Sequence, residues 1–217
     1  MSFQALATAS QKYFPELQIK YKDQCWPMLL ICKLLFFLPS FKRHTTTIGD
    51  TIYFPSQKFV KLHPVTSYVV LLHELVHLHD QRRVGKLAFI TSYLFPQVLV
   101  PICLLLMFIV SWKIMLPLAL LCTLPIPAVF RMHWEKRAYL SSFYVLQLLG
   151  NRLHFDPHLK MQEDVFLKHL HGFSYYAPWP FHDINKQFDA ALDKAKSGKR
   201  PFQDQVFDML EDLSNKL

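Results

Sequence analysis

The stretch PVTSYVVLLHELVHLHDQRR, residues 64–83, predicts both a central helix of the fold and a candidate functional site. Pro64 suits the first turn of a helix, and the apolar side chains that dominate the next fifteen or so positions predict a buried helix. Within it, His73, Glu74 and His77 form the pattern His-Glu-x-x-His. Residues i and i+4 of an α-helix share one face, so both imidazoles can reach a single ion. The segment therefore predicts a metal-binding helix.

The pattern suits a catalytic zinc site, and the ligand types favour Zn²⁺ over other divalent ions. Catalytic zinc takes three protein ligands and leaves one position open for water. Glu74 follows His73 directly and is placed to accept the proton of that water during attack on a peptide carbonyl. A hydrogen-bonded core trio without metal is the alternative, because short motifs arise by chance and the chain has 11 histidines. The cost of burying such a cluster unpaired favours the metal.

HELVH together with WEKRAY, residues 134–139, resembles the gluzincin group of zincin metallopeptidases. In that group a glutamate on a later helix supplies the third zinc ligand, and the matching residue is Glu135. The segment TIGDTIYFP, residues 47–55, resembles the edge strand that aligns a substrate above the active-site helix. The resemblance covers roughly residues 45–145. It implies a zinc endopeptidase with a mostly helical α+β fold, a minimal zincin core with a short β-hairpin.

Other residues compete for roles in this site. Asp80 is a rival third ligand, but a rigid helix does not wrap three consecutive ligands around one ion, so we expect Asp80 to orient a histidine. His79 and His133 point to other faces and are expected at a surface or an interface. Gluzincins offer a tyrosine, histidine or arginine to a developing oxyanion, and the resemblance leaves four candidates open, each with a structural or interfacial role as the alternative: Arg137, His171, Tyr175 and Tyr176.

A long apolar region separates the two parts of the predicted site. Residues 87–112 and 114–130 contain no charged side chain, and only Lys113 lies between them. The first run is long enough to cross about 30 Å of hydrocarbon as a helix, and the second is near the lower limit of about 17 residues. Several prolines predict kinks or a re-entrant portion. A transmembrane helical hairpin inserted into the zincin core is the simplest interpretation, and it resembles membrane-integrated zincins.

The charges around this hairpin predict its orientation. Basic residues flank both outer ends: Arg82, Arg83, Lys86, Arg131, Lys136 and Arg137. The positive-inside rule then places both ends in the cytoplasm. Because two passes return the chain to the side it left, Glu135 and the His-Glu-x-x-His helix share that side. We therefore expect an integral membrane protein with a cytoplasmic active site.

Five segments follow from these patterns. An N-terminal segment, 1–43, is expected to hold a short helix and an interfacial or re-entrant helix over 26–39, for which a buried core helix is the alternative. Residues 44–86 form the core, with two short strands and the metal-binding helix, and residues 87–130 form the hairpin. Residues 131–150 form the glutamate helix, which ends at Gly150. Residues 151–217 form a C-terminal region with amphipathic helices over 186–196 and 202–215.

Composition narrows the function classes. The net charge is +8, but no basic run is interleaved with aromatic residues, so we expect no nucleic-acid partner. Basic clusters flank the apolar segments instead, so we expect a lipid bilayer as one partner. The predicted zinc site adds a protein or peptide substrate as the other. The four cysteines form no disulfide framework, and the N-terminus carries no signal-peptide pattern. The rival class is a non-catalytic membrane scaffold or remodelling protein with a structural metal site.

Overall fold

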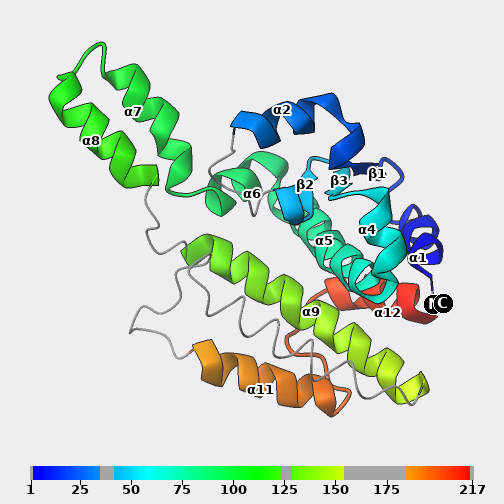
Figure 1. Cartoon of the computed structure of the whole chain (residues 1–217). Coiled ribbons are helices and arrows are strands. Elements are labelled where there is room, and N and C mark those ends of the chain that lie inside the picture. Colours follow the sequence, from blue (N-terminus) through cyan, green and yellow to red (C-terminus); the bar gives the residue numbers. More distant parts are fainter. Residues whose placement is uncertain (1, 35–41, 124–128, 154–183, 216–217) are drawn as a thin grey trace. The chain divides into compact units, whose positions relative to one another are not determined.

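A computed structural model describes residues 2–34, 42–123, 129–153 and 184–215 of the chain (Figure 1). It is mostly helical with one small sheet, which confirms the predicted mostly helical α+β class. The chain divides into two compact units, residues 1–79 with 203–217, and residues 80–202.

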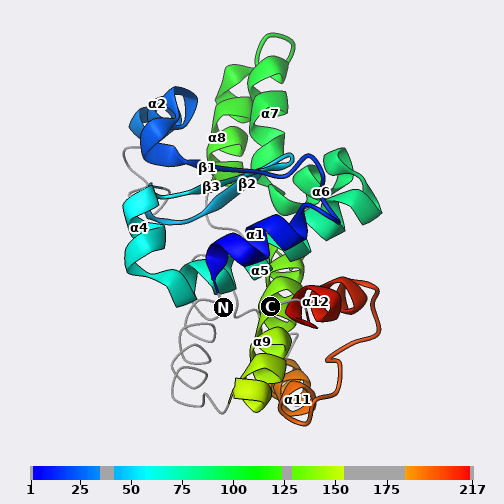
Figure 2. The same cartoon turned by 90° about the vertical axis from the view of Figure 1, so that its right-hand side faces the viewer.

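The first unit contains a three-stranded sheet in the order β1-β3-β2 (Figure 2). The predicted hairpin is present as β2 (Thr46–Ile48) antiparallel to β3 (Thr51–Phe54). Gly49 adopts a φ of +58° in the turn, which a glycine adopts without the steric cost of a Cβ. β1 (Gln18–Tyr21) pairs parallel with β3 and was not predicted, because four residues are too few to establish an alternating pattern. β2 is thus an edge strand, while β3 is central.

Helices complete the first unit: α1 (Phe3–Ser10), α2 (Trp26–Leu34), α4 (Gln57–Leu62), the larger part of α5 (Pro64–Val84) and α12 (Val206–Asn215), with the 3₁₀ turn η1 (Lys22–Gln24). The apolar stripe of α12, including Val206, Leu210 and Leu213, is fully buried, as core packing predicts. The predicted helix over 26–39 begins as α2, and residues 35–39 lie outside the described part. Its start is exposed at Trp26.

Helix α5 begins at Pro64, as predicted. Leu71, Leu72, Leu75 and Val76 are fully buried along its middle, which confirms the predicted buried helix. The helix ends before Gly85, whose φ of +91° lets the chain turn into the next helix.

The second unit contains the remaining helices: α6 (Lys86–Tyr93), α7 (Val100–Leu106), α8 (Trp112–Thr123), α9 (Val129–Leu153) and α11 (Ile184–Lys196), with the 3₁₀ turn η2 (Gln97–Leu99). Helices α7 and α8 lie side by side as a hairpin (Figure 1). In the apolar region, residues 87–112 do not form one continuous helix, and the kink that the prolines predicted is present. The segments 86–93 and 97–106 are instead bent by 102°. Pro96 accounts for the break, since proline lacks the amide hydrogen that continues a helix.

No single helix among the described residues is both long enough and apolar enough to cross a bilayer. The bent segments 86–93 and 97–106, taken together, have the length and apolar composition that a crossing needs.

Helix α9 runs three residues beyond the predicted end at Gly150. A glycine inside a helix costs only about 1 kcal/mol relative to alanine, so a long helix tolerates it. The last two amphipathic segments are helical as predicted, but α12 begins at Val206 and leaves Phe202 outside. The oxyanion candidates His171, Tyr175 and Tyr176 lie outside the described residues.

Candidate metal centre

Two histidines of α5 face each other, one helical turn apart. The Nε2 atoms of His73 and His77 are 3.1 Å apart, and the rings meet edge to face with centroids 4.7 Å apart. His77 is buried and His73 partly so. This is the arrangement that the i, i+4 spacing predicts, because the helix itself sets it.

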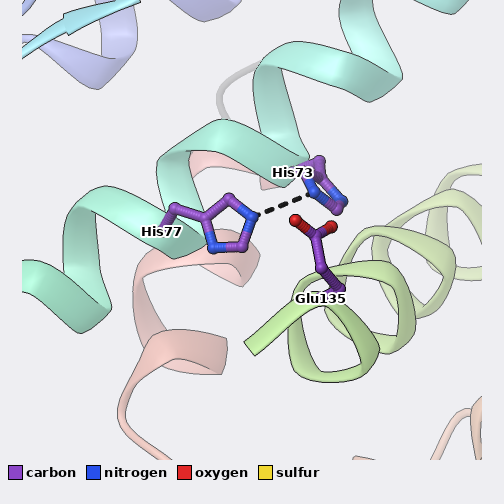
Figure 3. A group of neighbouring side chains, drawn as sticks. All are labelled: His73, His77 and Glu135. Carbon is purple, nitrogen blue, oxygen red and sulfur yellow. Dashed lines mark hydrogen bonds between the residues drawn. The ribbon is translucent and has the colours of Figure 1, made fainter. Parts of the chain in front are cut away.

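Glu135 of α9 completes a group with these two histidines (Figure 3). The ligand atoms of the three residues all lie within 4.8 Å of one another, and the Glu135 side chain is buried. Two imidazole nitrogens and one carboxylate oxygen form a donor set found in catalytic zinc sites. The three residues therefore fit a zinc ion. Within the described residues, Asp80, His79 and His133 are not members of this group.

The Glu135 carboxylate is held by a residue that the sequence did not single out. The Tyr93 hydroxyl, at the end of α6, donates a hydrogen bond to Glu135 Oε1. One turn of α9 around Glu135 makes two more polar contacts with α6. Trp134 Nε1 donates to Ser92 Oγ at 3.0 Å, and Arg131 Nε donates to the Tyr93 carbonyl at 3.2 Å.

Glu74 is buried and contacts the edge strand. Its Oε2 accepts a hydrogen bond of 2.5 Å from the Thr47 hydroxyl of β2. A hydrogen bond to a carboxylate fixes its orientation as well as stabilising its charge. The strand that resembles the substrate-aligning strand of zincins therefore also holds the predicted base.

A buried lysine supports the start of that strand. Lys22 is only 2% exposed, and its Nζ donates to the His44 carbonyl and to Thr46 Oγ1, both at 2.7 Å. Burial lowers the pKa of Lys22 to about 8, while the nearby Cys32 and Glu74 act in the opposite direction. Because Thr46 precedes Thr47, the lysine anchors the part of β2 that contacts Glu74.

Asp80 pairs with an arginine on the glutamate helix. Arg137 Nε donates to both Asp80 oxygens at 2.8 Å, and both side chains are buried. The Arg137 guanidinium also lies 5.0 Å from the Phe202 ring. The predicted role of Asp80 in orienting a histidine stays a prediction, as does the oxyanion role of Arg137. His133 is exposed, in line with a surface position, and His79 is half-buried.

Tyr93, Thr47 and Lys22 were missed because each acts through a contact distant in sequence. One signal for Tyr93 was present in the sequence, since a tyrosine in an otherwise uncharged apolar run needs a hydrogen-bond partner for its hydroxyl when buried. Nothing in the sequence around Thr47 or Lys22 separates them from other strand and turn residues.

The comparisons with known proteins assign the chain to no family: no family model, no curated sequence and no solved structure matches it.

Proposed function

We propose that this chain is a zinc-dependent endopeptidase of the membrane. The observation that carries the proposal is the group formed by His73, His77 and Glu135, in which all ligand atoms lie within 4.8 Å of one another. The gluzincin resemblance specified these three residues from spacing and motif alone. Their convergence supports one ligand set rather than three unrelated buried side chains.

The residues divide the chemistry among them. His73, His77 and Glu135 would hold zinc, which when bound polarises a carbonyl and lowers the pKa of water to about 7. Glu74 accepts a proton from the attacking water and returns it to the leaving amine. The hydrogen bond from Thr47 keeps the Glu74 carboxylate oriented for this transfer.

A protein or peptide in extended form is the substrate class that the surroundings of Glu74 favour. β2 lies at an edge of the sheet and carries Thr47, the partner of Glu74. An edge strand offers backbone donors and acceptors to an extended chain. A substrate strand along β2 would bring its peptide bonds past the base.

The apolar region supports a membrane location. Large apolar side chains are exposed along α6 and at the turn between α7 and α8, with Leu87 at 80%, Phe108 at 90% and Ile109 at 84%. Exposed apolar side chains as large and as numerous as these favour lipid over water. We propose an integral membrane protein whose active site faces the cytoplasm and whose substrate is a membrane or juxtamembrane protein.

The test is a Glu74→Gln variant of the full chain in detergent, with zinc content and cleavage of a mixed library of quenched fluorescent peptides measured together. Glu74→Gln should keep its zinc and lose at least about 100-fold in cleavage rate, because it removes only the base. His77→Ala should lose both zinc and cleavage. Glu16→Gln, an exposed glutamate, serves as the matched control and should change neither. Equal cleavage by wild type and Glu74→Gln would overturn the mechanism.

The same exposed apolar side chains also support the second candidate, a non-catalytic membrane scaffold with a structural metal. Structural zinc sites are closed by four protein ligands, whereas the group in the described residues has three. Zinc bound without any cleavage by the wild type, and with four protein ligands in its X-ray absorption spectrum, would favour the scaffold.

A further inference from the structure

We propose that Tyr93 is a positioning residue that holds the Glu135 carboxylate in the orientation required for metal binding. The inference rests on the proposed metal site and adds to it a residue of the apolar region. Tyr93 donates its hydroxyl hydrogen to Glu135 Oε1. A carboxylate has two oxygens, so one can accept from Tyr93 while the other faces the histidines.

The hydrogen bond matters because Glu135 lacks the help that the histidines receive from their helix. His73 and His77 are aligned by i, i+4 geometry, whereas a glutamate side chain alone has several rotamers of similar energy. A partner that hydrogen-bonds a metal-ligating carboxylate fixes its orientation, and such partners strengthen metal affinity about 10- to 100-fold.

Tyr93 is itself held in place by two residues, Phe89 and Arg131. Its ring stacks on Phe89 of the same helix, with centroids 5.7 Å apart. Arg131 of α9 places its guanidinium 5.0 Å from the centroid of the Tyr93 ring, and its Nε donates to the Tyr93 carbonyl at 3.2 Å. These contacts restrict the phenol, so its hydroxyl is aimed at Glu135 before any ion binds.

A neighbouring contact joins the same two helices without touching the carboxylate. Trp134 Nε1 donates to Ser92 Oγ at 3.0 Å, and the Trp134 ring lies 5.1 Å from Phe89. Ser92 directly precedes Tyr93, and Trp134 directly precedes Glu135. Loss of the Trp134–Ser92 bond therefore reports on loosening of α6 against α9, while loss of the Tyr93 hydroxyl reports on Glu135 itself.

The experiment compares Tyr93→Phe with Ser92→Ala in the full chain, purified in detergent. Zinc dissociation constants are measured by competition with a chelator, and the visible absorption bands of the Co²⁺-loaded proteins are recorded. Tyr93→Phe should weaken zinc binding about 10- to 100-fold and shift the Co²⁺ bands. Ser92→Ala should stay within about threefold of the wild type, because it removes a contact but no partner of the ligand.

Three results would overturn the proposal, and they differ from one another. Wild-type zinc affinity and unchanged Co²⁺ bands in Tyr93→Phe would show that the phenol does not orient Glu135, while leaving the zinc site intact. Equal weakening in both variants would show a general loosening of α6 against α9. An absence of zinc binding by the wild type would remove the metal site and the proposed function with it.

Discussion

Helices α5 and α9 supply their ligands in different ways. The two histidines of α5 are four residues apart, and the helix alone brings their Nε2 atoms within 3.1 Å. Glu135 stands 58 positions after His77, and its carboxylate is held by Tyr93 at the end of α6. One half of the ligand set is thus fixed by local geometry, and the other half by contacts between elements. The first half should tolerate changes elsewhere in the chain, whereas the second should not.

The largest effect is expected at the buried pair of Asp80 and Arg137, which holds α9 two residues from Glu135. Arg137→Gln should lower the free energy of unfolding by about 3–5 kcal/mol, because it removes the buried partner charge that contacts the Asp80 carboxylate directly and leaves Arg83 at the longer distance of 3.8 Å. Arg83, 3.8 Å from Asp80 and 45% exposed in its side chain, is the matched control. Arg83→Gln should cost less than about 1 kcal/mol.

Denaturation of both variants in the same detergent measures the difference. A loss for Arg137→Gln no greater than that for Arg83→Gln would mean that the buried pair does not anchor the glutamate helix. The claim that contacts between elements fix the position of Glu135 would then lose part of its evidence.

A smaller effect is expected at Thr47. It tests whether Glu74 of α5, unlike the two histidines of that helix, needs a contact from another element to function. Thr47→Val removes the hydroxyl that donates to Glu74 at 2.5 Å. A hydrogen bond to a charged group contributes about 1.5–3 kcal/mol, so kcat should fall roughly 10- to 100-fold while zinc content stays unchanged. Thr51→Val, on the adjacent strand β3, should leave kcat within about threefold. A wild-type kcat in Thr47→Val would show that Glu74 needs no support from β2.

The last effect, confined to alkaline pH, is a pH dependence of stability at Lys22, which donates hydrogen bonds to the start of that strand. Burial lowers its pKa from 10.5 to about 8, so between these values the unfolded chain binds more protons than the folded chain. The stability of the wild type should therefore rise with pH across this range, relative to Lys22→Met, by up to about 1.4 kcal/mol per pH unit. Lys20→Met, at an exposed lysine of β1, should run parallel to the wild type. Parallel curves for Lys22→Met would contradict the buried-lysine account.

The same contrast explains how far the sequence could predict the structure. The helix from Pro64, the β2–β3 hairpin and the buried stripe of α12 follow from local signals, namely a proline at a helix start, a glycine turn and apolar periodicity. Strand β1 could not be predicted, because its parallel pairing with β3 joins residues 33 positions apart and its own pattern spans only four residues.

The apolar region shows the limit from the other side. Its length and lack of charge predicted a run long enough to cross a bilayer, and its prolines predicted kinks. The bend of 102° at Pro96 confirms a kink, but the sequence could not give its size, because hydropathy counts apolar residues and does not measure how far a proline turns the backbone. Arg137 illustrates the same limit: the sequence presents it as a flanking charge of the hairpin, whereas the structure buries it against Asp80.

The most direct test of the central claim is the zinc content of the detergent-purified chain and of its His77→Ala and Glu135→Ala variants, by mass spectrometry. The account predicts about one zinc per chain in the wild type and its loss in both variants, one from each half of the ligand set. No zinc in the wild type after reconstitution would contradict it, as would full zinc retention in Glu135→Ala.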